Sequence, residues 1–376
     1  MTVASIFVLW LQTLAFLPVN ASVPSPSSTA IGVTYNSPFS PSTPSPSADR
    51  IASVVSALHF DCLRLPNPDP NLIRSFAFTN ISLFLSIPNT LLLPLAYNRS
   101  VAVQWLSGHV LPFYPRTKIS IISVGDDAVS TELSPYLLPA IRNVRLALHD
   151  VGISKISVST TFSFVNVITD AFPPSAALFQ EPIVEPVIKP LLQFLEDNNS
   201  SFVVKLFPYN MYKTNSEIPL GFALFQEYPF NFRDDLVTGV RYRNLFDIMV
   251  DSVVTSMAVA GYQNIPIIVA ETGWPSSSSD FSEVDATPAY AETYIKGLVA
   301  HLNSGLGTPL RKEGVAETYI FELADEEVNQ RTRNWGVLYA NMTKKYNVEF
   351  SGRGRSDVAA GILLVICLLM VACSLF

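Results

Sequence analysis

Short apolar segments alternate with longer segments of helical periodicity along the chain from residue 31 onward. The short segments are rich in β-branched residues and contain few charges, which is typical of strands buried on both faces of a parallel sheet. The eight predicted strands are residues 31–35, 60–65, 81–87, 119–125, 156–162, 202–207, 265–271 and 318–323.

The segments between these strands repeat apolar residues at the spacing of one helix face. In the segment 242–261, such residues recur at i, i+3, i+4 and i+7, as expected for a helix that packs one side against a sheet. The longest predicted helices are residues 133–152, 184–197, 242–261 and 286–305.

Eight strand and helix units predict an α/β protein with a single (β/α)8 TIM barrel, which a chain of 376 residues can hold. The Pro- and Ser-rich segment 36–47 is predicted to be a loop after the first strand. A doubly wound open sheet is the alternative. However, no strand is followed by GxGxxG or GxxxxGKS/T, so the phosphate-binding loops common in that fold are missing from the sequence.

Both ends of the chain have the pattern of processing signals. Residues 1–21 contain an apolar run followed by small residues of the kind found at a signal-peptidase cleavage site. This pattern predicts a signal peptide and a mature domain of residues 22–350. The apolar tail 358–376 follows a short polar segment, which predicts a GPI-attachment signal over residues 351–376 with Ser351 or Gly352 as the lipidated residue. A C-terminal transmembrane anchor is the alternative.

Composition narrows the choice of partner. The net charge of -7, the pI near 5.2 and the lack of a basic run argue against nucleic acid and favour a neutral substrate. Of three cysteines, Cys367 and Cys373 lie in the apolar tail, so the mature domain is expected to hold only a buried strand residue, Cys62, and no internal disulfide. N-glycosylation sequons, which favour an extracellular location, occur at Asn80, Asn98, Asn198, Asn199 and Asn341.

Acidic residues stand at the carboxyl ends of the predicted strands, where the active site of such a barrel lies. Asp126 and Asp127 follow the fourth strand, and Glu271 ends the seventh. The eighth strand is followed by Glu322, Asp325, Glu326 and Glu327. Carboxylates that face each other across a barrel mouth are what glycoside hydrolysis requires. These acids could equally be solvated turn residues or members of structural ion pairs, because a fold does not imply a function.

Several sequence blocks, in this order, resemble glycoside hydrolase family 17, the plant endo-1,3-β-glucanases. They include IGVTYN, ISIISVGDD, FPPSAALF, IIVAETGWPS and LGTPLR, and the resemblance extends over residues 31–346. It implies a (β/α)8 barrel, no metal or organic cofactor, and retaining hydrolysis through a covalent intermediate on Glu271. The substrate-binding ring that it implies comprises Tyr35, Arg64, Asp126, Tyr209, Trp274 and Glu326, with Trp274 able to stack on a sugar ring.

The sequence departs from the family pattern at the residue expected to donate a proton. The family motif VGNE is Val124-Gly125-Asp126-Asp127 here, which makes Asp127 the acid/base with a side chain one methylene shorter. A shorter side chain withdraws the acid carboxyl from the glycosidic oxygen, and catalysis in a retaining site depends on the distance between its two carboxyls. Asp126 replaces a neutral amide and, when ionised, can only accept hydrogen bonds. If both acids faced Glu271, each would disfavour the ionisation of the other and help Asp127 to keep its proton.

Other departures fall in the same region of the expected cleft. Pro66 and Phe207 stand where the family has tyrosines, Lys205 replaces a small amide, and Asn329 replaces a lysine, while Glu326 is kept. The sequence therefore predicts slow hydrolysis of internal 1,3-β-D-glucosidic linkages in callose-like cell-wall glucan by a monomer anchored outside the plasma membrane. A non-catalytic glucan-binding wall protein is the alternative, and transglycosylation through Glu271 is a third reading.

Overall fold

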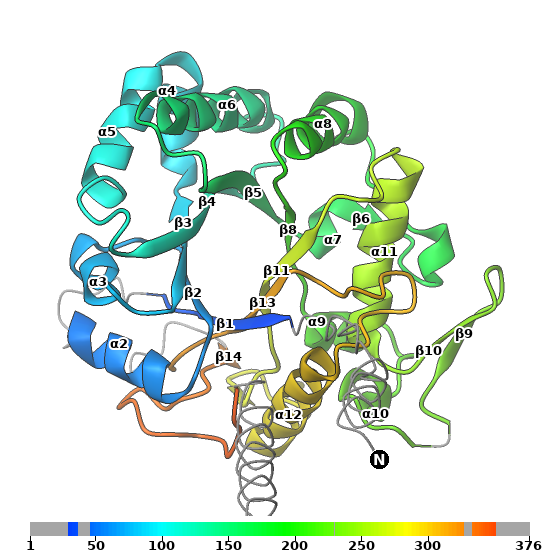
Figure 1. Ribbon diagram of the computed structural model, residues 1–376. Helices are drawn as coiled ribbons and strands as arrows, with labels where there is room; N and C mark the ends of the chain where they lie inside the picture. Colours follow the sequence, from blue (N-terminus) through cyan, green and yellow to red (C-terminus); the bar gives the residue numbers. More distant parts are fainter. Residues whose placement is uncertain (1–28, 37–45, 229, 327–332, 351–376) are drawn as a thin grey trace, which may run out of the picture.

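Eight parallel strands form a closed barrel in the computed structural model, which describes residues 29–36, 46–228, 230–326 and 333–350 (Figure 1). The strand order around the barrel is β1-β13-β11-β8-β5-β4-β3-β2, and β1 pairs with both β2 and β13. The barrel strands are β1 (Ala30–Thr34), β2 (Cys62–Leu65), β3 (Ser82–Ile87), β4 (Lys118–Asp126), β5 (Ser157–Ser163), β8 (Phe202–Lys205), β11 (Ile267–Thr272) and β13 (Glu317–Phe321). The predicted (β/α)8 barrel is confirmed, and closure excludes the open sheet.

All eight predicted strands are present, with ends that shift by up to two residues. At β8 the apolar run continues to Phe207, but the strand ends at Lys205. Pro208 begins the next helix and has no backbone N–H for the sheet ladder, which is the physical reason for the early end.

Helices surround the barrel and cover its outer face (Figure 1). Their bounds are α2 (Ala48–Ala57), α3 (Pro70–Ser75), α4 (Leu92–Tyr97), α5 (Arg99–His109), α6 (Ser134–Asp150), α7 (Phe164–Val167), α8 (Lys189–Asp197), α9 (Pro208–Thr214), α10 (Leu220–Ala223), α11 (Leu245–Val259) and α12 (Pro288–Ser304). Single turns are η1 (Asn89–Leu91), η2 (Pro174–Ala176) and the π-helical η3 (Val184–Ile188), so the predicted helix 184–197 begins as a π turn. Short strands outside the barrel are β6 (Ile168–Thr169), β7 (Leu178–Phe179), β9 (Arg233–Asp235), β10 (Val240–Tyr242), β12 (Ser277–Ser278) and β14 (Arg333–Asn334).

Polar side chains fix where several of these helices begin. Asp69, Asn98, Asn244 and Thr287 each precede a helix and accept a hydrogen bond from a backbone N–H of its first turn. Such caps satisfy N–H groups that have no partner within the helix. Gly305 ends α12 in a left-handed conformation that glycine adopts without strain.

The barrel interior is filled by side chains and forms a core layer distinct from the one between strands and helices. The inner layer comprises Cys62, Phe84, Ile121, Val203, Ile268, Ala270 and Tyr319. Cys62 is fully buried and free, as predicted for a strand residue, and burial raises the pKa of its thiol.

The predicted signal peptide and the predicted GPI signal lie outside the described residues. No helix in the described part of the chain is long and apolar enough to cross a membrane.

Two buried carboxyls on α11 tie this helix to α12 and the loop that follows it. Twelve of the fifteen residues of α11 are buried, which exceeds the single buried face that the periodicity predicts. Asp251 accepts hydrogen bonds from the Thr308 hydroxyl and, at 2.9 Å, from the Leu310 backbone N–H. One turn earlier, Asp247 Oδ1 lies 2.8 Å from Nε2 of His301 on α12.

Burial raises the pKa of Asp251 to about 7, in spite of its hydrogen bonds. Burial also lowers the pKa of His301, but the hydrogen bond and charge of Asp247 outweigh this effect and leave that pKa above its ordinary value. Both shifts have the same consequence for stability. Each group has a higher pKa in the folded than in the unfolded protein. At a pH between these two values, the native state holds a proton that the unfolded chain has released, so the free energy of unfolding falls as the pH rises.

We therefore expect the free energy of unfolding to be higher near pH 5 than near pH 8. Replacement of Asp251 by Asn keeps one of the two side-chain acceptors that Thr308 and Leu310 use and removes the ionisation, so D251N should flatten the decline between about pH 4 and pH 7. Urea unfolding of both proteins over a series of pH values measures this difference. Parallel pH profiles for the native chain and D251N would contradict the assignment.

Candidate active site

Glu271 stands at the carboxyl end of β11, where a buried arginine holds its side chain. It is 9% exposed, and its Oε1 accepts a hydrogen bond from Nη1 of Arg64. Arg64 lies on β2, is fully buried, and places its guanidinium 5.3 Å from the centre of the Phe84 ring. Because the arginine side chain is enclosed by the barrel interior, it fixes the direction in which the Glu271 carboxyl points.

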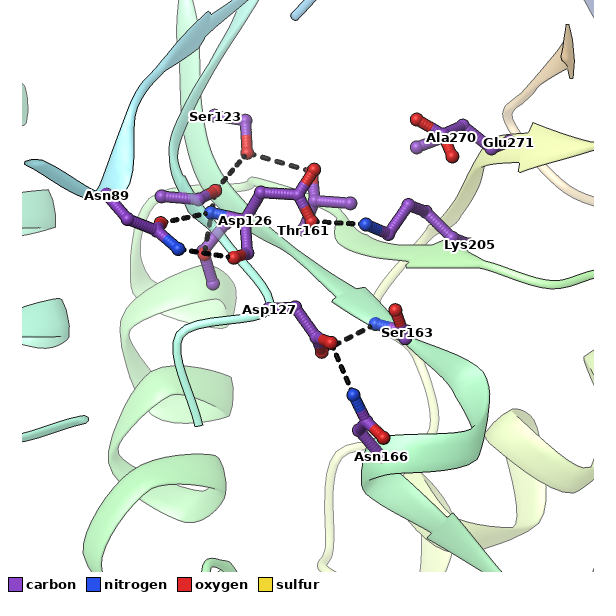
Figure 2. Close-up of polar contacts among 12 residues, drawn as sticks. Asn89, Ser123, Asp126, Asp127, Thr161, Ser163, Asn166, Lys205, Ala270 and Glu271 are labelled. Carbon is purple, nitrogen blue, oxygen red and sulfur yellow. Dashed lines mark hydrogen bonds and ion pairs between the residues drawn. The ribbon is translucent and has the colours of Figure 1, made fainter. Parts of the chain in front are cut away.

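Asp126 is the carboxyl that shares this arginine with Glu271. Its Oδ2 accepts from Nη2 of Arg64 at 3.2 Å. Its Oδ1 accepts from the Lys205 ammonium (Figure 2). Asn89 fixes the backbone of Asp126 from both sides, since its Oδ1 accepts from the Asp126 N–H and its Nδ2 donates to the Asp126 carbonyl, each at 2.8 Å. We call Arg64, Asp126, Lys205 and Glu271 the mouth network; its two cations and two anions balance in formal charge.

Irregular strand pairing brings the members of the mouth network together. The register of β11 against β8 shifts between Val269 and Glu271 and places Glu271 opposite Lys205. The register of β4 against β5 shifts between Ser123 and Asp126 and places Asp126 opposite Thr161. Such bulges redirect side chains and are common beside active sites.

Asp127 points away from the mouth network. Its φ of 55° is in the left-handed region, and its backbone N–H donates to the Thr161 carbonyl at 2.7 Å. Its carboxyl accepts from the Ser163 N–H at 3.0 Å and from the Asn166 side-chain amide, on the side away from Glu271 in Figure 2. Of the two acids, Asp126 shares Arg64 with Glu271, whereas the left-handed turn carries the Asp127 side chain toward the start of α7. The acid/base role of Asp127 stays a prediction.

Two of the three aromatic residues in the predicted ring, Trp274 and Tyr209, are buried in the core. Trp274 is 1% exposed, donates its indole N–H to the Asp285 carbonyl at 2.9 Å, and packs 4.9 Å from Tyr209 between ring centroids. Tyr212 and Tyr294 also contact the Trp274 ring. The expectation that Trp274 offers an open face for a sugar is wrong, because neighbouring rings cover it, and Tyr209 is likewise fully buried.

Tyr35 and Glu326, two further residues of the predicted ring, lie near enough for the charge of Glu326 to affect the Tyr35 hydroxyl. Tyr35 is 7% exposed and donates its backbone N–H to the Arg64 carbonyl at 3.0 Å. Burial and the charge of Glu326 raise the pKa of the Tyr35 hydroxyl to about 12. Glu322 accepts from the Asn36 amide at 3.1 Å. Glu327 and Asn329 lie outside the described residues.

Asp325 and Phe207 have packing partners in the loops after the last strands. Asp325 accepts from the Lys345 ammonium and, at 2.9 Å, from the Gly336 N–H. Phe207, one of the departures from the family pattern, packs against Trp335 with ring centroids 5.1 Å apart. Asp325 therefore acts as a structural ion-pair partner, one of the alternatives that the sequence left open.

The structure assigns local roles to three residues that the sequence did not single out. Asn89 could have been suspected, because it follows β3 at the same end of the barrel as Asp126. Ser163 and Asn166 carry no such signal, because their contact with Asp127 depends on the positive φ of that residue. Within the described ranges, no cluster of three or more His, Cys, Asp or Glu side chains could hold a metal ion.

A closed (β/α)8 barrel with two carboxyls bridged at the carboxyl ends of its strands has the architecture of a glycoside hydrolase. Comparison with protein families makes this specific. Residues 31–350 match the model for glycosyl hydrolases family 17, and the chain belongs to that family.

Named relatives agree with this assignment. The chain is 38% identical over 316 residues to glucan endo-1,3-beta-glucosidase 2 of Arabidopsis thaliana, covering 82% of this chain and 62% of the relative. It is 32% identical to a glucan endo-1,3-beta-glucosidase of Nicotiana tabacum, covering 81% of this chain and 85% of that protein. The chain thus spans about three fifths of the length of several Arabidopsis relatives.

Solved structures show the same likeness. CJP38, a beta-1,3-glucanase and allergen of Cryptomeria japonica pollen, superimposes with a TM-score of 0.78 at 33% identity, covering 86% of this chain and 99% of that one. A beta-1,3-glucanosyltransferase of Rhizomucor miehei superimposes with a TM-score of 0.52 at 14% identity, which shows the shared fold alone.

The buried position of Arg64 predicts a large effect on stability. In R64M, Glu271 would keep its buried carboxyl but lose its cation, which should lower the free energy of unfolding by about 3 to 5 kcal/mol. R99M is a matched control, because the Arg99 and Asp150 side chains are 39% and 48% exposed and such surface pairs contribute at most about 1 kcal/mol. Urea unfolding at neutral pH compares the two variants, and equal losses would contradict a structural role for the mouth network.

Proposed function

We propose that the barrel binds β-1,3-glucan and hydrolyses its internal 1,3-β-D-glucosidic linkages by a retaining mechanism, with Glu271 as the nucleophile. The observation that carries this proposal is the Glu271 carboxyl, which is nearly buried at the carboxyl end of β11 and oriented by Arg64. The relatives named for glucan endo-1,3-beta-glucosidase activity, together with family membership, support the choice of substrate and linkage.

A retaining mechanism needs one carboxyl as nucleophile and a second as acid/base. Glu271 would attack the anomeric carbon, and the acid/base would give a proton to the departing sugar oxygen. For Asp127 to do this, its carboxyl must leave the Ser163 N–H and the Asn166 amide and turn toward the mouth. Proton transfer contributes roughly 100- to 10,000-fold to such reactions. Turnover of glucan should therefore be slow.

The mouth network favours a second candidate function, the binding of β-1,3-glucan without cleavage. Both oxygens of Asp126 accept hydrogen bonds from cationic groups, and Arg64 also holds Glu271. A network whose members already satisfy one another can be kept for structure rather than for chemistry. On this reading, the barrel mouth would retain wall glucan next to the anchored protein.

Release of reducing ends from a linear β-1,3-glucan by the purified protein tests the first candidate. We expect slow release that disappears in E271Q, because the amide keeps an oxygen for Arg64 but cannot act as a nucleophile. Binding of the same glucan is measured in parallel. Retained binding without release from either protein would reject hydrolysis and leave the binding function.

We also propose that the protein is secreted and held on the outer face of the plasma membrane, at the cell wall, as a GPI-anchored monomer with Ser351 as the lipidated residue. Asn80, Asn98, Asn199 and Asn341 are exposed and open to N-glycosylation. Asn198 is half-buried, and its amide nitrogen donates to the Phe194 carbonyl at 2.8 Å. This contact favours Asn199 as the modified residue of the adjacent pair.

Treatment of intact expressing cells with a phosphatidylinositol-specific phospholipase should release the protein into the medium, because cleavage of the lipid removes its attachment. The released protein should lose mass when its N-glycans are removed, and an N199Q variant should lose one glycan where N198Q loses none. Protein that stays with the membrane after phospholipase treatment would favour a transmembrane anchor.

A further inference from the structure

The two carboxyls that follow one another at the end of β4 are both engaged as hydrogen-bond acceptors. Asp126 accepts from Arg64 and Lys205, and Asp127 accepts from Ser163 and Asn166. All four carboxyl oxygens thus face an N–H group. Both carboxyls therefore act as acceptors, and each of their oxygens already has a donor within the protein.

The two cations that contact Asp126 and the nearby Tyr35 hydroxyl are poor substitutes for a carboxylic acid. Lys205 and Arg64 direct their N–H groups at Asp126 and Glu271. The Tyr35 hydroxyl, with its pKa of about 12, is too weak an acid to assist a departing alcohol efficiently at neutral pH. In contrast, the proposed nucleophile is held in a fixed orientation, because Arg64 binds one oxygen of the Glu271 carboxylate.

We infer that this site acts on β-glucosyl donors whose leaving group departs without being protonated, such as β-laminaribiosyl fluoride and β-laminaribiosides of acidic phenols. The inference rests on the proposed function for its sugar specificity and for the role of Glu271. It extends that function by naming the class of aglycone. An ordinary sugar alcohol is a poor leaving group as an alkoxide, whereas fluoride or a nitrophenolate is stable as an anion.

The reaction balances without a protein acid in its first step. A Glu271 oxygen forms a bond to the anomeric carbon while the bond from that carbon to the leaving group breaks, and the leaving group takes the electron pair. The product is a glucosyl ester of Glu271 and a free anion. Water then attacks the anomeric carbon, the Glu271 carboxylate departs, and the proton of the water goes to the solvent. Without a base close to that water, the second step is slow and the ester accumulates.

A series of aryl β-laminaribiosides with phenols of increasing acidity tests this inference on the purified protein. We expect the first-order rate of phenol release to rise steeply with the acidity of the phenol. The 2,4-dinitrophenyl compound should react at least about 100-fold faster than the 4-methylphenyl compound, which matches the loss of a proton-transfer contribution. Intact mass spectrometry should detect a laminaribiosyl adduct, and peptide mapping should place it on Glu271. Azide should accelerate turnover and yield a glycosyl azide, because this anion needs no base.

Two variants keep the test decisive. E271Q, checked for folding by its thermal transition, should form no adduct with any donor. D127N removes the carboxyl that the sequence assigns as acid/base. If the dependence on phenol acidity becomes steeper in D127N than in the native protein, Asp127 gives a proton to the leaving group and the inference is wrong.

The remaining outcomes separate this inference from the function on which it rests. Rates that are nearly independent of phenol acidity, together with rapid cleavage of glucan that needs Glu271, would overturn the inference and leave the proposed hydrolysis intact. A folded native protein that forms no adduct and releases no 2,4-dinitrophenol would overturn both.

Discussion

The guanidinium of Arg64 is the group on which the barrel mouth depends. It is fully buried on β2, and it binds carboxyls from β4 and β11, strands that lie on different sides of the barrel in its closed order. Burial of a charge is costly unless the charge is paired. The buried Arg64 therefore needs the carboxyls of Asp126 and Glu271 beside it. The same contacts that satisfy Arg64 therefore orient the proposed nucleophile. Stability and the proposed chemistry depend on one side chain.

Lys205 and Asp126 depart together from the pattern that the family resemblance implies, and the structure gives a physical reason. Each would introduce a charge into a partly enclosed site, but the ammonium and the carboxylate are in direct contact. Neither substitution is neutral alone, because it would leave an unpaired charge next to Arg64 and Glu271. Together they preserve the charge balance of the mouth.

The sequence predicted the scaffold well and the orientation of side chains at the mouth less well. The strands and the long helices follow from apolar periodicity, and Glu271 follows from its place at the end of a predicted strand. Whether Asp126 or Asp127 faces the mouth depends on a bulge in β4 and on a residue with positive φ, which periodicity does not encode. Trp274 was misjudged for a related reason, because the rings that cover it come from distant segments.

The Asp127 carboxyl makes local contacts with the backbone and with Asn166 that the sequence does not predict. Its carboxyl receives the Ser163 N–H at the start of α7, a contact that satisfies a backbone donor otherwise left without a partner in the helix. A short side chain in a left-handed turn is well suited to such local capping. Because this contact turns the carboxyl away from Glu271, Asp127 would have to leave Ser163 and Asn166 before it could complete a retaining pair with the proposed nucleophile. The selection of leaving groups inferred for this site follows from that requirement.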